Sequence, residues 1–365
     1  MTEAARMPGS DRAEPAALKT VAVVASNRGD SLTAFLAAWS PAPWSEMVVV
    51  EDGPRKTFDL GRPGVPLHHV AWDDIAAEAA VGRPDPFSRR DSAIKLFGFW
   101  LAATRLGADI VIGLDDDCLP VGEPAGFVAA HLSALAPRPR WVPSHDDLPT
   151  RGLPYYDLGT MEGAVANMGL WQGIADHDAP QTLALRRLGL SGHDHRPGAG
   201  SRLMHPRQYW PWCAMNIAFR AEVLPLLYMP KMGEGSPYRR FDDIWSGIIL
   251  QRCCRHLGLL LSAGDPHIRH NRASDPMANL EKEAPGIRAN EDFWKVVDAV
   301  PLTEMETDPL ACMEAVASHF AVAGRDRTLA GRNAVLAAYL AEEADRIRSW
   351  CGMFRGPGAS GRSPA

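Results

Sequence analysis

The sequence predicts an α/β protein whose central sheet is mostly parallel and flanked by helices. Near the N-terminus, two β-branched runs, Thr20–Ala25 (TVAVVA) and Met47–Val50 (MVVV), enclose Leu32–Trp39, whose apolar residues have helical spacing. This alternation of strand, helix and strand is typical of a parallel sheet. Further along, Asp109–Leu114 (DIVIGL) is almost continuously apolar, as expected of a strand that is covered on both faces.

The other regular elements are mainly helices. Apolar residues at three- and four-residue intervals predict helices at Ser88–Leu106 and Asp242–Leu257, and Gly107 and Gly258 follow them as stop signals. A strand, LGLLLSA, is expected at the end of the second helix. Ala-rich segments predict two closing helices, Asp308–Phe320 and Arg332–Phe354.

These elements indicate one folded domain over about residues 19–354, with its C-terminal helices at about 308–354. The leader, residues 1–18, and the tail, residues 355–365, are too poor in apolar groups to pack, so we expect both to be disordered. The segment Pro137–Gly200 is rich in Pro, Gly, Asp and His with weak periodicity, which predicts long loops over a site or a flexible insertion.

Composition excludes several classes of protein. The formal net charge of −6, without a basic run, argues against a nucleic-acid partner. No apolar segment reaches the roughly 18 residues that a membrane span requires. The six cysteines lack zinc-site or disulfide spacing, which favours reduced thiols in a cytoplasmic protein. The sequence leaves a homo-oligomer open.

Three consecutive carboxylates, Asp115–Asp117 in GLDDDCLP, follow the strand Asp109–Leu114. Open α/β sheets bind ligands at the carboxyl ends of their strands. Because side chains alternate along a strand, Asp115 and Asp117 could converge on a divalent cation while Asp116 points elsewhere. The alternative is a solvated acidic turn in which Asp117 caps a following helix.

Three other polar motifs allow both a functional and a structural interpretation. Asp242 and Asp243 begin a predicted helix, where they could cap it or serve as base or nucleophile. Asp52, in EDG after a strand, could accept hydrogen bonds from a base or ribose, or form an Asp-Gly turn. His267 and His270 could bind a metal or be ordinary hydrogen-bonded histidines.

Taken in order, these pieces resemble the reversibly glycosylated polypeptides, a family whose plant members include UDP-arabinopyranose mutases. The matching stretches run in the family's order over most of the predicted domain: VVVEDGPRKTFDL, SRRDSAIKLFGF, GLDDDCLP, GLWQGIADHDAPQTL, PWCAMNIAF, MGEGSPYRRFDDIWSG and HLGL through HIRHNRASDPMANLEKE. The resemblance implies an A-type glycosyltransferase fold and a UDP-sugar as the partner.

The resemblance also implies roles for individual residues. It makes Asp115, Asp117 and His270 the ligands of a divalent metal ion, Mn²⁺ or Mg²⁺. Asp116 is a fourth possible ligand. The resemblance places substrate-binding groups at Asp52, Asp91, Lys95, Trp171 and Asn216, and a catalytic group at Arg151. For the chemical step we expect Asp243, or its neighbour Asp242, either to deprotonate the attacking group or to stabilise an oxocarbenium-like intermediate. Arg151 stands where the family carries its reversibly glycosylated arginine. Because a protonated guanidinium is a poor nucleophile, the alternative role of Arg151 is a phosphate clamp.

The activity that follows is a nucleotide-sugar mutase. It would interconvert pyranose and furanose forms of a UDP-sugar, UDP-arabinopyranose and UDP-arabinofuranose by default, with metal-assisted cleavage of the sugar-diphosphate bond and transient self-glycosylation. Plant members carry a second arginine seven residues after the first, where this chain has Leu158. Two alternatives therefore stay open: a glycosyltransferase acting on a small-molecule or protein acceptor, and a non-catalytic nucleotide-sugar-binding partner subunit.

Overall fold

A single large sheet forms the centre of the molecule. The computed structural model describes residues 18–61, 63–78, 82–139, 151–152, 161–173, 176–189, 200–270 and 275–355, and over these residues the sheet has nine strands. They are β1 (Thr20–Ser26), β2 (Glu46–Glu51), β3 (Leu67–Val70), β4 (Ile110–Asp115), β5 (Cys118–Pro120), β8 (Ala164–Gly173), β9 (Arg202–Leu203), β10 (Asn216–Arg220) and β11 (Leu260–His270). Two short strands, β6 (Arg138–Pro139) and β7 (Met161–Glu162), pair separately.

The sheet is parallel in its first half and mixed in its second. Its strand order is β3-β2-β1-β4-β10-β8-β11-β5, and β9 pairs with β11. From β3 to β4 all pairings are parallel, while β10 runs antiparallel to both β4 and β8. Strand β8 is again parallel to β11. The carboxyl ends of β1, β4, β8 and β11 therefore lie at the same edge of the sheet as the start of β10.

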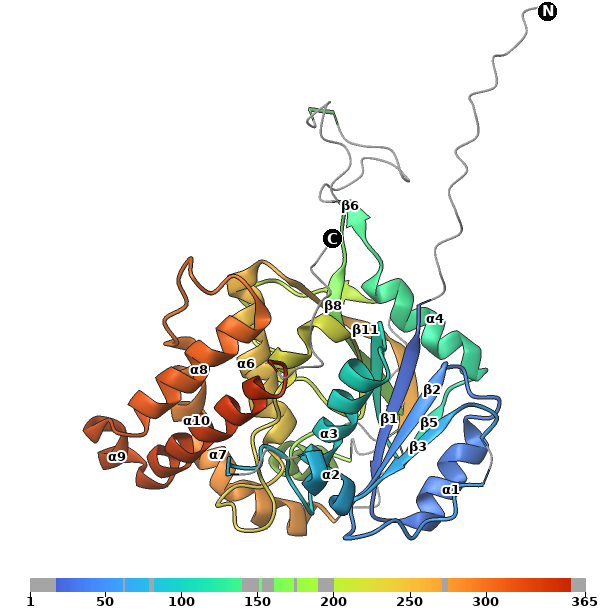
Figure 1. The fold of residues 1–365 in the computed structure, drawn as a ribbon, viewed down its shortest axis with the longest axis horizontal. Helices are drawn as coiled ribbons and strands as arrows, with labels where there is room; N and C mark the ends of the chain where they lie inside the picture. The colour runs from blue at the N-terminus through green and yellow to red at the C-terminus, as the bar shows by residue number, and fades with distance from the viewer. Residues whose placement is uncertain are drawn as a thin grey trace, which may run out of the picture.

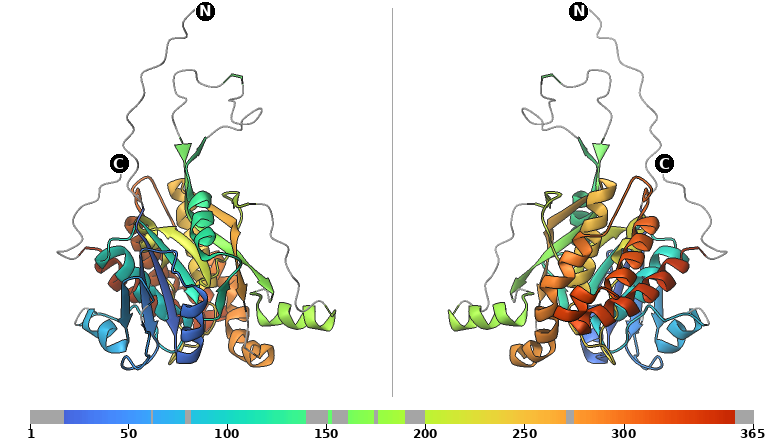
Figure 2. Two further views of the ribbon diagram at one scale, coloured as in Figure 1. Left: turned by 90° about the vertical axis from the view of Figure 1, so that its right-hand side faces the viewer. Right: turned by 90° about the vertical axis from the view of Figure 1, so that its left-hand side faces the viewer.

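Helices cover both faces of the sheet (Figures 1 and 2). They are α1 (Gly29–Ala38), α2 (Trp72–Glu78), α3 (Lys95–Trp100), α4 (Pro124–Leu135), α5 (Ala179–Arg187), α6 (Asp242–Leu257), α7 (Pro276–Asp298), α8 (Pro309–Ala323), α9 (Arg327–Arg332) and α10 (Ala334–Gly352), with short 3₁₀ turns at Ser92–Ile94 and Ala221–Leu227 and a π-helical turn at Leu101–Arg105.

The two layers of helices are held by aromatic contacts. On one face, Trp39, which directly follows α1, packs edge-on against Phe127 of α4, with ring centroids 4.8 Å apart. On the other face α3 lies against β1 and β2, and Phe97 of α3 contacts Phe87, which in turn packs against Trp350 of α10. The C-terminal helices are thus joined to the sheet through one continuous apolar core.

The predicted α/β class is confirmed, and so is the helix Asp242–Leu257, which ends at Gly258 with a φ of 69°. The helix predicted from Ser88 begins only at Ser92, because Asp91 caps it by accepting a hydrogen bond from the Ala93 N–H. The expectation of loops throughout Pro137–Gly200 is wrong in part. The strand β8 and the helix α5 lie within that segment.

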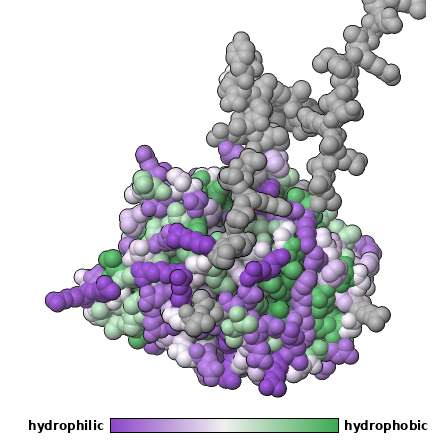
Figure 3. All heavy atoms as spheres, in the orientation of Figure 1, coloured by the Kyte–Doolittle hydropathy of each residue, from purple (hydrophilic) through white to green (hydrophobic). Residues whose placement is uncertain are grey.

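Hydrophilic side chains cover much of the molecular face seen in Figure 3, with apolar atoms between them. Among the described residues, no helix combines the length and apolar character that crossing a membrane requires. The leader and tail that the sequence predicts to be disordered lie, apart from Leu18 and Arg355, outside the described residues.

Candidate active site

The strand register brings distant polar residues to one edge of the sheet. Ala25 of β1 lies opposite Asp115 of β4, and Asn216 of β10 lies opposite Leu114. On the far side, His270 at the end of β11 pairs with Gly173 at the end of β8. This edge is where the sequence places the acidic triplet.

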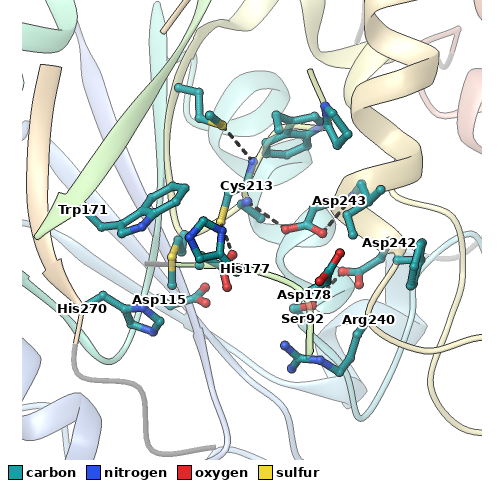
Figure 4. Close-up of a pocket in the computed structure, with 18 of the residues that line it drawn as sticks. Ser92, Asp115, Trp171, His177, Asp178, Cys213, Arg240, Asp242, Asp243 and His270 are labelled. Atoms are coloured by element: carbon teal, nitrogen blue, oxygen red, sulfur yellow. Dashed lines mark hydrogen bonds between the residues drawn. The ribbon is translucent and has the colours of Figure 1, made fainter. Parts of the chain in front are cut away.

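A cavity of about 880 Å³ opens at this edge. Figure 4 shows Trp171, Asp115 and His270 on one side of it and Asp242, Asp243 and Arg240 on the other, with Cys213 and His177 between them. The described residues that line it also include Arg28, Ser92, Asp117, Asp176, Asp178, Gln181, Trp210, Trp212, Phe241, Ile244, Glu283, Ile287 and Asn290.

Each carboxylate of the triplet has a cationic neighbour. Asp115 forms an ion pair with Lys95. Asp116 accepts from Ser26 Oγ at 2.5 Å and from Arg28 Nε at 3.2 Å. Asp117 lies 3.6 Å from Arg28 Nη2 and 3.9 Å from His270 Nε2. These neighbours offset the repulsion among the three adjacent carboxylates.

Lys95 supports the floor of the cavity from below. Its side chain is fully buried, and Nζ also donates to the Ala214 carbonyl at 2.9 Å. Burial opposes the charge on Lys95, but the attraction of Asp115 outweighs it, so the pKa of Lys95 is raised. The lysine therefore stays charged and fixes the Asp115 carboxylate beneath the cavity.

The donor set at the triplet fits a divalent cation. Asp115, Asp117 and His270 all line the cavity, and carboxylate and imidazole groups are ligands that Mn²⁺ accepts. Burial and the adjacent Asp115 disfavour the charged form of Asp117 and so raise its pKa. A bound cation would stabilise that charged form. In the described part of the chain, no three such side chains already converge at ligand distances. Asp116 does not fit as a ligand, because both of its oxygens are engaged by Ser26 and Arg28.

The opposite wall is built on the start of α6. The N-cap residue of α6 is Phe241. Neither Asp242 nor Asp243 therefore caps the helix. Asp242 accepts from Ser92 Oγ at 2.7 Å, and Asp243 accepts from the Ala214 N–H at 3.2 Å. Burial raises the pKa of Asp242, and burial together with Asp242 and Asp176 raises that of Asp243 well above its usual range. Both carboxylates line the cavity, and their raised pKa values favour the uptake of a proton.

Beside this acidic pair, a second group of side chains closes the cavity. Arg240 has a φ of 63° and donates from Nε to the buried Glu283 at 2.8 Å. Glu283 also accepts from the Ala179 N–H at the start of α5, at 2.6 Å. The thiol of Cys213 donates to Asp176 at 2.8 Å, and burial next to this carboxylate raises the pKa of Cys213. The wall is thus rich in hydrogen-bond acceptors.

The family model described as "Reversibly glycosylated polypeptide" matches residues 18–354, nearly the whole chain. The chain belongs to this family. It is 29% identical over 333 residues to UDP-arabinopyranose mutase 1 of rice (Oryza sativa subsp. japonica), covering 87% of this chain and 85% of that protein. It is 30% identical over 286 residues to UDP-arabinopyranose mutase 1 of Arabidopsis thaliana, covering 74% and 77%.

Among solved structures, the chain is similar to glucosyl-3-phosphoglycerate synthase from Mycobacterium tuberculosis in complex with Mn²⁺, uridine diphosphate and glucosyl-3-phosphoglycerate. The TM-score is 0.44, with 18% sequence identity over 79% of this chain and 85% of that one.

Two of the residues expected near the substrate are occupied by structural hydrogen bonds. Asn216 is fully buried, and its amide donates to the Leu170 and Pro266 carbonyls at 2.7 and 3.0 Å. It ties β10 to its neighbours instead of facing the cavity. Asp91 caps the turn before α3 and accepts from Ser88 Oγ at 2.7 Å, and burial raises its pKa. Neither residue lines the cavity.

Asp52 and Arg151 also lie away from the cavity lining. Asp52 accepts from Trp72 Nε1 at 2.8 Å and from the Arg90 N–H at 3.0 Å. Arg151 is exposed in a described turn whose neighbours on both sides lie outside the described residues. Of the substrate-binding set, Trp171 lines the cavity and Lys95 supports Asp115. His267 pairs with Asp265 at 3.0 Å and is not part of the lining.

Several lining residues were missed by the sequence reasoning. Arg28 lies in the turn two residues after the end of β1, at the same edge of the sheet as the triplet, and this position was the signal that could have found it. Arg240 and Asp176 stand inside motifs that mark the family but were not singled out. Glu283 ends the last of these matching stretches, but only the tertiary structure shows that it reaches the cavity from within α7.

Proposed function

We propose that this protein is a nucleotide-sugar mutase that interconverts the pyranose and furanose forms of a UDP-sugar, with UDP-arabinose as the default substrate. The observation that carries the proposal is one cavity, in a chain of this family, that sets Asp115 and Asp117 opposite Asp242 and Asp243. The names of the rice and Arabidopsis relatives support the same activity.

The charge of the cavity supports a divalent cation. Seven carboxylates line the described cavity, from Asp115, Asp117, Asp176, Asp178, Asp242, Asp243 and Glu283, against two guanidinium groups, from Arg28 and Arg240. A diphosphate would be repelled from such a site unless a cation joined it. Held by Asp115, Asp117 and His270, Mn²⁺ or Mg²⁺ would supply charge neutralisation on the departing diphosphate.

The acidic pair has the chemistry that ring contraction requires. When the bond from the anomeric carbon to the diphosphate breaks, positive charge develops on the sugar, and a nearby carboxylate stabilises it. Ring opening and reclosure also move a hydroxyl proton, and a carboxylate with a raised pKa is suited to accept and return it. We assign the proton transfer to Asp243, whose pKa is raised further, and the charge stabilisation to Asp242.

Transient self-glycosylation would place the sugar on Arg151. A guanidinium is protonated at ordinary pH and is a poor nucleophile without a base, and Arg151 is exposed in the described turn. We therefore propose that attachment at Arg151 requires this turn to approach the cavity during turnover. Mass spectrometry after incubation with a nucleotide sugar labelled in the sugar should find the label on Arg151. An unlabelled protein that still turns over would rule this step out.

One incubation tests the main proposal. The purified protein is incubated with UDP-arabinopyranose and Mn²⁺, and the nucleotide sugars are resolved by chromatography. A UDP-arabinofuranose peak supports the mutase. Release of UDP only when an acceptor is added would replace it with the glycosyltransferase alternative, and binding without any turnover would replace it with the partner-subunit alternative.

A further inference from the structure

Arg28 projects into the cavity from the turn that follows β1. Its side chain is 44% exposed and lines the cavity beside the triplet. The turn is fixed locally, because the Arg28 N–H donates to Ser26 Oγ at 2.9 Å. The same hydroxyl donates to Asp116 at 2.5 Å. Ser26 therefore positions both the backbone of Arg28 and the carboxylate that binds the Arg28 side chain.

Asp116 grips the guanidinium of Arg28 from one side. The carboxylate is almost fully buried, with 5% of its side chain exposed, and it receives Nε on one oxygen and Nη2 on the other. Such a two-point contact fixes the plane of the guanidinium as well as its position. A lysine could supply the charge but not this orientation.

The other side of the guanidinium has donors to spare. A guanidinium carries five N–H groups. Nε and Nη2 are directed at Asp116, and Nη2 also lies 3.6 Å from Asp117. Within the described part of the chain, the hydrogen bonds and ion pairs of this guanidinium are made by Nε and Nη2, and none is made by Nη1. The second cation of the cavity lining, Arg240, is held by Glu283 on the opposite wall. Arg28 is therefore the guanidinium available to an anion beside the triplet.

We propose that Arg28 binds the diphosphate of the nucleotide sugar through Nη1, and that Asp116 is its positioning residue and not a metal ligand. This inference rests on the proposed function for the identity of the ligand. The three carboxylates of the triplet then have different roles, since Asp115 and Asp117 serve the cation and Asp116 serves the arginine. An oriented guanidinium adds a second positive group to the diphosphate from the protein itself.

The test compares binding of UDP with binding of uridine, by titration calorimetry with Mn²⁺ present. Arg28→Ala is expected to weaken UDP binding at least tenfold and to leave uridine binding within about threefold. Arg28→Lys should recover only part of the lost UDP affinity. Lysine keeps the positive charge but cannot make the two-point contact of a guanidinium. Equal losses for UDP and uridine in Arg28→Ala would overturn the proposal, since the arginine would then contact the nucleoside.

Asp116→Asn tests the positioning role. It is expected to weaken UDP binding severalfold while Mn²⁺ binding, measured directly by electron paramagnetic resonance without nucleotide, stays as in the wild type. Asp117→Asn should instead lose Mn²⁺ binding. If Asp116→Asn lost Mn²⁺ to the same extent as Asp117→Asn, Asp116 would be a ligand and the proposal would fail.

Two controls separate this result from folding and from the proposed function. Arg348→Ala removes an exposed arginine that pairs with Asp345 on α10, and it should change neither ligand's affinity. Each variant is checked by its thermal unfolding midpoint, and Arg28→Gln replaces Arg28→Ala if the latter does not fold. A wild-type protein that binds UDP but forms no furanose would refute the mutase and leave this inference standing. A wild-type protein that does not bind UDP would refute both.

Discussion

Lys95 forms an ion pair with Asp115 although the lysine side chain is fully buried, whereas about a third of the aspartate, 33%, is exposed to the cavity. Replacing Lys95 by Met should lower the free energy of unfolding by about 2 to 3 kcal/mol, less than for a fully buried pair, because water partly solvates the remaining carboxylate. Urea unfolding of the variant measures this change.

The double variant Lys95→Met/Asp115→Asn is the control for that loss. Removing both charges leaves no uncompensated carboxylate, so part of the lost stability should return, with a coupling free energy of about 1 to 2 kcal/mol. Simple additivity of the two single variants would mean that the ion pair does not hold the floor of the cavity.

Asp243→Asn should lower kcat by about 100-fold or more, since it removes a proton-accepting group while keeping the shape of the side chain. UDP affinity should change little, and Asp345→Asn, an exposed aspartate on α10, should leave kcat unaltered. Steady-state kinetics and a UDP titration separate the two effects. A variant that loses affinity and keeps kcat would place Asp243 in binding.

The pH dependence of kcat is a second test of the role of Asp243 as a base. Burial, Asp242 and Asp176 raise its pKa well above 3.8, and a base works only when it is deprotonated. The kcat of the wild type should therefore fall as the pH drops through a midpoint well above 3.8. The residual activity of Asp243→Asn should lack that midpoint. An unchanged profile in the variant would assign the titration to another group.

The sequence identifies residues well where the local pattern carries the signal. Gly258 ends α6 as predicted, because the positive φ at a helix end favours glycine. The acidic triplet lies at the end of a buried strand, which an apolar run followed by charge predicts without any knowledge of the tertiary structure. Such features depend on neighbours along the chain.

The partners of those residues depend on the tertiary register and could not be predicted. The resemblance to the family implies that the Asn216 amide lies near the sugar. Its acceptors are the backbone carbonyls of Leu170 and Pro266, which carry no side-chain signal. Likewise, nothing local to Asp116 indicates that Arg28, 88 residues earlier, occupies its carboxylate.

His131 should make stability fall below about pH 6.5. It is fully buried between Asn216 and Asn167, and burial lowers its pKa to about 3. Because the Asn167 amide donates to Nδ1, this nitrogen must stay unprotonated. The unfolded chain takes up a proton near pH 6.5 and the folded protein does not, so each pH unit from about 6.5 down to about 3 costs about 1.4 kcal/mol.

The comparison with His131→Gln isolates this contribution, since glutamine offers a donor and an acceptor but does not titrate. Urea unfolding at pH 7.0, 6.0 and 5.0 should give a steeper loss of stability for the wild type than for the variant. Parallel lines for the two proteins would mean that His131 is protonated in the folded state.

Gly98 and Gly331 form a matched pair of helical glycines with opposite surroundings. A Cβ at Gly98, on α3, would lie 2.8 Å from Val50 Cγ2 and even closer to Val23, whereas a Cβ at Gly331, on α9, meets nothing within 4 Å. Gly98→Ala should lower the free energy of unfolding by about 1 to 3 kcal/mol, because α3 must move off the sheet. Gly331→Ala should raise it by up to about 1 kcal/mol through helix propensity.

Thermal unfolding of both variants measures this difference in stability, and equal shifts would show that α3 is not packed against the sheet at Gly98. Since α3 begins with Lys95, displacement at Gly98 should also weaken UDP binding, and Gly331→Ala should not.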